Sequence, residues 1–404
     1  MSRRRVYHVA GFDPDPPASV HGRFSRGLAR FQGVWSLTAS ATPPEIEADR
    51  ACWSVVAAGP NWRVETQHCL LRWDDVIVAL HRRPVWRRIP EGVLALADFI
   101  AGGALWGYLR HSWRYALFFL FPVLVFLGIL AVAAGVAMLA ASWTGSAVAG
   151  LLLGLASFIG LILLAQKRIH LGLLFDDWIF ARELVRSGHG ELDGRIGRIA
   201  AQLAHEAGSG AFDEVVVIGH SLGAVLAVQL VDAAITLERE AGRPAPQLVL
   251  VTAGSSILKL GLHRAAKGLR ASLARVSACP SVFWADVQAR SDLINFFSPD
   301  PLAAMGLANR ASPLVRAISL RRLLTPERYA AIRLNAYKVH CMFVRANDRR
   351  AVYDYFMLAC GPLRTELQLR APEGAMGYID ADGSLIETLR APQAAATPAI
   401  TDAR

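Results

Sequence analysis

A serine between two glycines is the part of this chain best suited to chemistry. The segment Gly219-His220-Ser221-Leu222-Gly223 follows the apolar run Val215–Ile218 and precedes a stretch with helical character from about 222 to 240. A chain that turns sharply from strand to helix exposes the central side chain, and the positions two before and two after it must be very small. The following helix N-terminus also supplies free N–H groups beside the serine oxygen. The segment therefore predicts a nucleophile at Ser221, with a tight structural turn as the alternative.

Strands and helices alternate along much of the chain. The run Val215–Ile218 is fully apolar, which is typical of a parallel strand covered on both faces. Such alternation predicts an α/β fold with a mostly parallel sheet flanked by helices. The expected strands are 6–10, 51–58, 62–71, 76–80, 215–218, 247–253 and 281–287. The expected helices are 23–32, 176–187, 192–207, 222–240, 257–275 and 347–359.

An uncharged block interrupts this pattern. No Asp, Glu, Lys or Arg occurs from Tyr115 to Gln166. That run can supply two helices of the roughly 20 residues that a bilayer requires. Its middle, residues 141–146, is small and polar with one Trp. We therefore expect a transmembrane hairpin before the nucleophile strand, with spans near 116–139 and 147–165. Two buried core helices are the alternative.

The chain is expected to consist of four parts, one of which is the hairpin. Strands are expected on both sides of it, so residues 1–110 and 170–371 should fold together as one α/β domain that carries the catalytic residues. The hairpin itself occupies 115–166. Residues 372–404 form an Ala-, Pro- and Thr-rich tail, which we expect to be flexible.

Positive charge predicts the orientation of the hairpin. Its connecting turn carries none, whereas basic residues flank both spans: Arg82, Arg83, Arg87, Arg88, Arg110, Arg114, Lys167 and Arg168. The positive-inside rule then places both ends, and the catalytic domain, on the cytosolic side of an inner (cytoplasmic) membrane. Gly150-x-x-x-Gly154 allows helices to approach closely, so homo-oligomers formed through the transmembrane helices are a further expectation.

The net charge of +10 has two common explanations, nucleic acid or an anionic membrane surface. The basic residues flank the apolar block and are not interleaved with stacking aromatics, which favours membrane lipids and disfavours nucleic acid as partners.

The first thirty or so residues contain no apolar segment of the kind that forms the core of a signal peptide. We therefore expect no cleavable signal peptide.

Cysteines and acidic pairs exclude other classes of site. The five cysteines are scattered without a CxxC pair, which argues against zinc or redox sites and predicts reduced thiols in the cytosol. Asp74-Asp75 and Asp176-Asp177 are interpreted as structural rather than metal-binding pairs. No nucleotide-binding or zinc-protease motif occurs, so we expect neither metal nor cofactor.

With its GHSLG segment between VVVI and AVLAVQLV, the chain resembles the α/β-hydrolase superfamily, particularly lipase- and esterase-like members. The resemblance covers roughly residues 5–90 and 170–360 and is specific only at the serine. It implies the chain order Ser, acid, His. Only His263 and His340 follow Ser221. His340 comes late, where the resemblance places the general base, and His220 is expected to pack near the turn.

The resemblance also points to an acid between Ser221 and His340. An Asp followed by two apolar residues, just past a late strand, resembles the acid of lipase-like members, which favours Asp292. Asp286, at the end of the expected strand, and Asp300, in an Asp-Pro turn, remain alternatives.

The resemblance further implies an oxyanion hole, formed by the Leu222 N–H and an N–H from the loop after the first strand. Gly11 or Phe12 would supply the second donor. The chain has Ala10-Gly11-Phe12 where lipases often have His-Gly, which is a departure from the pattern.

These expectations together describe a membrane-anchored serine esterase. A Ser221–His340–Asp292 triad would cleave a carboxylic ester, with a lipid as one candidate substrate, through an acyl-enzyme. A thioesterase or acyltransferase would use the same residues. The alternative outside enzymology is a non-catalytic membrane scaffold on a degenerate hydrolase fold.

Overall fold

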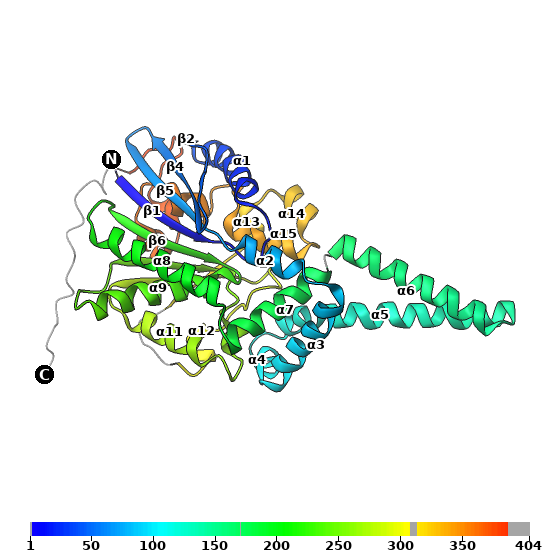
Figure 1. The fold of residues 1–404 in the computed structure, drawn as a ribbon. Coiled ribbons are helices and arrows are strands. Elements are labelled where there is room, and N and C mark those ends of the chain that lie inside the picture. Colours follow the sequence, from blue (N-terminus) through cyan, green and yellow to red (C-terminus); the bar gives the residue numbers. More distant parts are fainter. Residues whose placement is uncertain (1, 170, 308–312, 387–404) are drawn as a thin grey trace, which may run out of the picture.

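The central sheet joins strands from both sides of the hairpin. The computed structural model describes residues 2–169, 171–307 and 313–386. Within these ranges nine strands form one sheet in the order β2-β4-β5-β1-β6-β7-β8-β9, with β3 paired to β4 (Figure 1). Neighbouring strands from β5 to β9 run parallel, whereas the pairings of β4 are antiparallel. The predicted α/β class with a mostly parallel sheet is confirmed.

The bounds of the elements are as follows. The strands are β1 (Ser2–Val9), β2 (Thr38–Ala41), β3 (Glu45–Ile46), β4 (Arg50–Gly59), β5 (Trp62–Leu71), β6 (Glu214–His220), β7 (Leu248–Ala253), β8 (Val282–Ala289) and β9 (Leu314–Ile318). The helices up to the hairpin are α1 (Pro17–Trp35), α2 (Asp74–His81), α3 (Val85–Ala101), α4 (Ala104–His111), α5 (Trp113–Thr144) and α6 (Ala147–Ile169). Those that follow are α7 (Leu171–Arg186), α8 (Gly190–Gly208), α9 (Gly223–Glu240), α10 (Ile257–Gly261), α11 (Lys267–Ala278), α12 (Pro301–Ala304), α13 (Leu320–Leu323), α14 (Pro326–Ile332), α15 (Ala336–His340), η1 (Cys341–Val344), α16 (Tyr355–Cys360), α17 (Thr365–Arg370) and η2 (Gly374–Gly377).

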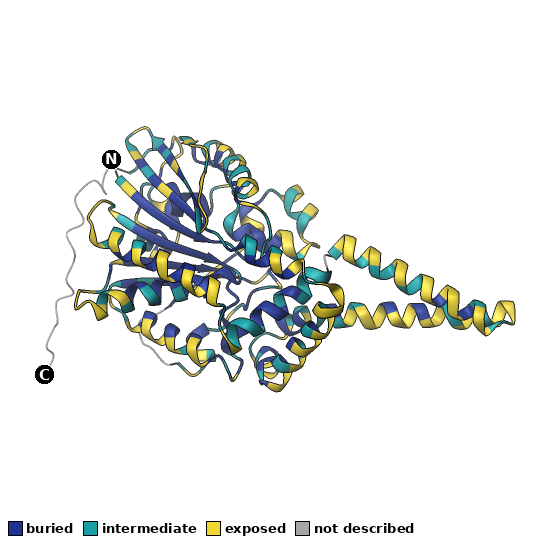
Figure 2. Cartoon of the chain, in the orientation of Figure 1, coloured by how far each residue is buried: buried dark blue, intermediate teal, exposed yellow. Residues whose placement is uncertain are grey.

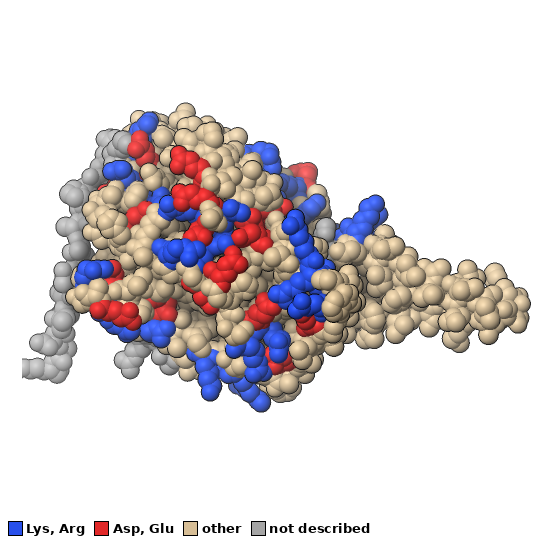
Figure 3. Space-filling model, viewed as in Figure 1, with Lys and Arg blue, Asp and Glu red and all other residues tan. Residues whose placement is uncertain are grey.

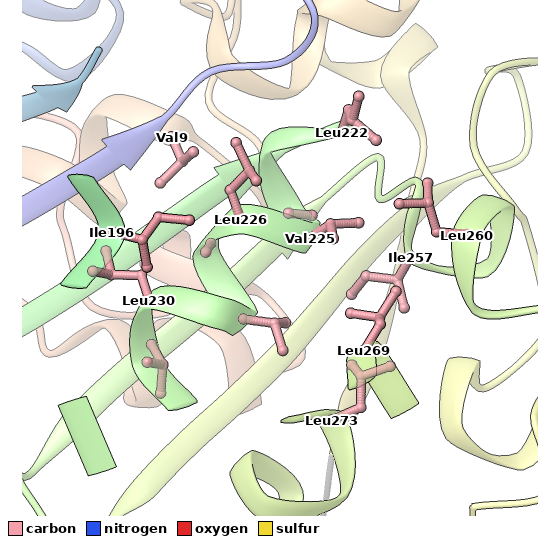
Figure 4. Packing of buried hydrophobic residues seen from close by; sticks show 14 of the residues in the cluster. Val9, Ile196, Leu222, Val225, Leu226, Leu230, Ile257, Leu260, Leu269 and Leu273 are labelled. Atoms are coloured by element: carbon pink, nitrogen blue, oxygen red, sulfur yellow. The ribbon is translucent and has the colours of Figure 1, made fainter. Parts of the chain in front are cut away.

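Helices cover both faces of the sheet, which explains the apolar run of β6. Val215 and Val217 pack with α8, α9 and α11, whereas Val216 and Ile218 face α1 and α16. Successive side chains of a strand alternate between faces, so a strand buried on both sides reads as continuously apolar. The interior strands are buried and the outward helix faces are exposed (Figure 2). Leu226 and Leu230 of α9 belong to the same packed cluster as Ile196 of α8 (Figure 4).

The hairpin projects from one end of this domain (Figure 1). α5 and α6 are each long and apolar enough to cross a membrane, as predicted. A Cβ on Gly150 would lie 2.6 Å from the Ala137 carbonyl oxygen, and one on Gly154 would lie 2.7 Å from the Ala137 Cβ. The close approach expected at these glycines therefore takes place between α5 and α6 of one chain, while association of copies stays a prediction.

Several element predictions are wrong in detail. Residues 76–80 form helix α2, not a strand. The run is apolar at nearly every position, so its periodicity does not separate the two states, and the acidic pair before it occupies the first turn, where negative charge stabilises a helix. The helix expected at 347–359 begins only at Tyr355 and ends at Cys360, and the expected 257–275 helix is divided into α10 and α11. The helices α3 and α4 and the strand β9 were not expected.

The expected flexible tail is partly ordered. Residues Gly374–Gly377 form η2, and Ile379 pairs with Leu385 in an isolated β-bridge. The indole N–H of Trp62 donates to the Gly383 carbonyl oxygen at 2.8 Å, which attaches this segment to the domain. Residues 387–404 lie outside the described residues.

Two cysteines are not free thiols. Cys52 and Cys69 form a disulfide, with Cα atoms 4.1 Å apart. They lie directly opposite one another in the antiparallel β4–β5 ladder, a register that residue types alone do not reveal. The prediction that all cysteines are reduced is therefore wrong for this pair, while Cys279, Cys341 and Cys360 are free.

Candidate active site

Ser221 stands on a strained turn at the carboxyl end of β6. Its φ is +55°, in the left-handed region that L-residues with a side chain rarely adopt. Its N–H donates to the Ala253 carbonyl oxygen, and its own carbonyl oxygen accepts from Ser256, each at 3.1 Å. A Cβ on Gly219 would lie 2.6 Å from the Ala224 Cα, and one on Gly223 would lie 2.2 Å from the Ala10 carbonyl oxygen. Both glycines are therefore required by the packing, as a nucleophile turn demands.

His340 and Asp292 form a buried pair beside this turn. The Nδ1–H of His340 donates to Asp292 Oδ2 at 2.6 Å. Both residues are about 2–3% exposed, so water does not compete for this hydrogen bond. A Cβ on Gly254, which follows β7, would lie 3.1 Å from His340 Cε1. The imidazole thus lies at the strand ends next to Ser221.

The loop after β8 positions the Asp292 carboxylate. Its Oδ1 accepts from the Ile294 N–H at 2.9 Å. The Asn295 side chain donates to the carbonyl oxygens of Ala289 and Asp292, which closes the loop. The carboxylate therefore has a backbone donor on one oxygen and the imidazole on the other.

The alternative acids lie elsewhere. Asp286 is bonded to Thr252 and Gln288, and burial raises the pKa of its carboxyl to about 6. Asp300 caps the short helix α12 by accepting from the N–H groups of Leu302 and Ala303. His263 is buried against the Asp98 carbonyl oxygen, so it does not approach the Asp292–His340 pair.

His220 lies against the backbone and the ring of His340. Its Nε2–H donates to the His340 carbonyl oxygen at 3.2 Å, and the two ring centroids are 4.6 Å apart. Burial, and then the neighbouring His340, hold the pKa of His220 well below its usual value. A neutral His220 therefore fixes the backbone of His340 without adding charge to the site.

The loop after β1 runs against the serine, as the expected oxyanion hole requires. A Cβ on Gly11 would lie 2.9 Å from Ser221 Cβ. Within the described residues, neither the Leu222 N–H nor the Phe12 N–H donates to another part of the chain. Both N–H groups therefore lack a partner within the described chain, and Phe12 lines the cavity that contains Ser221. The Phe12 ring packs against Trp73 and Phe180, which holds this loop in place.

Ser221 and His340 are not hydrogen-bonded to one another. His340 Nε2 is buried and has no partner among the described residues. The nitrogen that would accept the serine proton is thus unoccupied, and catalytic hydrogen bonds often shorten only when substrate binds.

A cavity of about 410 Å³ contains Ser221 and His340 in its wall. Tyr115 and Phe118 of α5 and Leu173 and Leu174 of α7 form an apolar part of the lining at the foot of the hairpin. Basic side chains line other parts: Arg23, Arg26, Arg30, Lys259, Arg328 and Arg345. The cavity therefore combines apolar walls with positive charge.

Sequence reasoning missed several contributors to this site. Lys259 is buried and forms an ion pair with Asp177, which belongs to α7 directly after the hairpin. Asn335 accepts from the Lys338 N–H and so caps α15, the helix that ends at His340. An Asn directly before the first residue of a helix is a recognisable capping signal. The Lys259–Asp177 contact joins segments far apart in the chain and has no local signal.

Carboxylates of both acidic pairs form ion pairs with basic side chains. Asp176 is fully buried and paired with Arg88 and His81, while Asp74 and Asp75 pair with Arg72 and Arg195. Among the described residues, no group of three or more His, Cys, Asp or Glu side chains could hold a metal ion.

The fold and the site define an α/β protein whose mostly parallel sheet and flanking helices are compatible with a hydrolase-like fold. In comparisons with known proteins, no protein family, no curated protein and no solved structure matches this chain.

Proposed function

We propose that this protein is a membrane-anchored serine hydrolase of the α/β-hydrolase type that cleaves a carboxylic ester. The observation that carries the proposal is the strained Ser221, exposed to a cavity that also contains the imidazole of the buried His340–Asp292 pair. A non-Gly residue in the left-handed region costs stability, and such strain concentrates at functional sites.

The proposed reaction passes through an acyl-enzyme. His340 Nε2 takes the proton of Ser221 Oγ as that oxygen attacks the ester carbonyl, and Asp292 stabilises the resulting imidazolium. The N–H groups of Leu222 and Phe12 bind the oxyanion. His340 then returns the proton to the leaving alcohol, after which water, deprotonated by the same imidazole, releases the acid and restores Ser221.

The cavity supports an ester with a long apolar group, such as a lipid. Its walls include Tyr115, Phe118, Leu173 and Leu174, all at the foot of the hairpin. A molecule dissolved in the bilayer that α5 and α6 enter would reach these walls without crossing bulk water. A thioester substrate, or transfer of the acyl group to an alcohol, would use the same residues.

A fluorophosphonate probe tests the proposal. Wild-type protein is expected to label covalently, and Ser221→Ala to lose labelling completely because the only attacking oxygen is removed. Ser256→Ala is the matched control: Ser256 also lines the cavity, and the contact it makes to Ser221 uses its backbone N–H, so labelling should persist.

The absence of labelling in folded wild-type protein would favour the non-catalytic scaffold. If labelling occurs, an ester series of increasing acyl length separates lipidic from short-chain substrates. The release of free acid, compared with transfer to an added alcohol, separates a hydrolase from an acyltransferase.

We further propose that the catalytic domain faces the cytosol from the inner membrane. The basic residues on both flanks of the hairpin, beginning with Arg110 and Arg114 before it and Lys167 and Arg168 after it, support this orientation. The Cys52–Cys69 disulfide argues the other way, since disulfides are rare in reducing compartments. The β4–β5 register brings these two side chains together whether or not they are oxidised, so we give the flanking charges more weight.

Cysteine labelling in intact cells decides the orientation. Trp143 lies at the end of α5 before the hairpin turn and is 83% exposed, while Glu240 lies at the far end of α9. With a membrane-impermeant maleimide, Trp143→Cys should label in intact cells and Glu240→Cys only after permeabilisation. The reverse pattern would place the catalytic domain on the oxidising side and overturn this orientation.

A further inference from the structure

Two helices that precede the hairpin expose an unusual amount of apolar surface. α3 and α4 expose Trp86 (74%) and Trp106 (73%), and α5 begins with Trp113 (62% exposed). The surrounding exposed residues are Val85, Ile89, Val93, Leu94, Ile100 and Leu109. We call these nine side chains the α3–α4 apolar face. Extended apolar surface of this kind marks an interaction site.

α3 has a second face that fixes its rotation. Gly92, Ala95 and Phe99 are buried against the domain, and a Cβ on Gly92 would lie 2.5 Å from the Phe175 ring of α7. Trp86, Ile89, Val93 and Ile100 follow helical spacing along a different stripe. Docking against α7 therefore directs the exposed stripe away from the catalytic domain.

The same docking argues against a membrane-crossing role for α3 and α4. The two helices together are apolar enough to be considered as a broken span, with a bend of 64° between them. Asp98 of α3, however, forms ion pairs with Arg182 and Arg186 of α7. A helix attached by charged pairs to the domain surface cannot also lie across the hydrocarbon core, but it can lie flat beside it.

The position of the face indicates what covers it. α4 leads into α5 through the single residue Ser112, beside the foot of the hairpin (Figure 1). Exposed apolar side chains continue across this junction at Leu109, Trp113 and Leu117. Lys and Arg side chains gather where the domain meets the hairpin, and the hairpin beyond its foot carries no charge on the side shown (Figure 3). Exposed Trp beside positive charge is typical of the headgroup region of a bilayer.

We propose that the α3–α4 apolar face lies in the headgroup region of the lipid bilayer, where it holds the catalytic domain against the membrane surface. The occupant of this face is phospholipid. The inference requires that α5 and α6 enter a bilayer, but it does not depend on the chemistry at Ser221. It assigns α3 and α4 a role separate from that of the hairpin, because the hairpin tethers the domain and the apolar face fixes its tilt.

Photo-crosslinking to lipid tests this proposal in the full-length chain. A photoreactive p-benzoylphenylalanine replaces Trp86, Val93 or Trp106 in separate variants reconstituted into phosphatidylcholine vesicles with traceable acyl chains. Leu124 on α5 provides the yield expected for bilayer contact. Leu237 on α9 is the negative control, since it is exposed but lies about 20 Å along its helix from the active-site end.

We expect lipid adducts at positions 86, 93 and 106, with a yield within a few-fold of the yield at position 124. We expect no adducts at position 237. Adducts at 124 but none at the three α3–α4 positions would overturn the proposal. Cross-links from those positions to a second copy of the chain would also overturn it, because the face would then be a protein interface. Neither outcome depends on hydrolase activity, so a failure here is distinguishable from a failure of the proposed function.

Discussion

Asp292→Asn is expected to lower kcat/KM for ester cleavage about 10⁴-fold while leaving the protein folded. Asp292 Oδ2 accepts the Nδ1–H of His340, and Oδ1 accepts from the Ile294 N–H. An amide keeps the oxygen that serves Ile294 but presents its NH₂ group to His340. The imidazole proton must then move to Nε2, the nitrogen that has to accept the proton of Ser221.

Asp286→Asn is the matched control for this prediction. Asp286 is equally buried but bonds to Thr252 and Gln288 and has no contact with His340. The kcat/KM of the Asp286→Asn variant, measured on a water-soluble ester, should remain within a few-fold of the wild-type value. If the Asp286 variant lost activity and the Asp292 variant kept it, the acid would be misassigned.

The proposed triad could be predicted because each member has a local or positional signal. Ser221 has the strand–turn–helix context, and His340 is one of only two histidines after it. Asp292 lies just past the end of β8, a late strand. Local pattern, together with the chain order that the resemblance to α/β-hydrolases implies, was enough to nominate the pair that the fold joins by a 2.6 Å hydrogen bond.

What the sequence did not reveal depends on contacts between distant segments. The disulfide of Cys52 follows from the β4–β5 register, and the Lys259–Asp177 ion pair follows from the docking of α7 on α10. The helices α3 and α4 were missed for another reason. Pro90 lies inside α3, and Gly102-Gly103 separate α3 from α4; in a sequence, both features indicate a helix break.

Gly223→Ala is expected to lower the free energy of unfolding by about 3 kcal/mol and to slow fluorophosphonate labelling more than about 10²-fold. The added methyl would lie 2.2 Å from the Ala10 carbonyl oxygen and 2.3 Å from that of Val9. Both contacts are to backbone, so no side-chain rotation relieves them. The loop after β1 must move away from the elbow, and the Phe12 N–H moves with it.

Gly197→Ala in α8 separates this effect from a general effect of replacing glycine. No heavy atom lies within 4 Å of a Cβ at Gly197, so alanine there should raise helix stability by up to about 1 kcal/mol and leave labelling unchanged. Thermal unfolding in detergent and the labelling rate, measured on both variants, give the comparison. Wild-type stability and labelling in Gly223→Ala would mean that the β1 loop does not lie against the nucleophile turn. The second oxyanion donor would then have to come from elsewhere, because the contact of this loop with Ser221 is the reason for assigning it to Phe12.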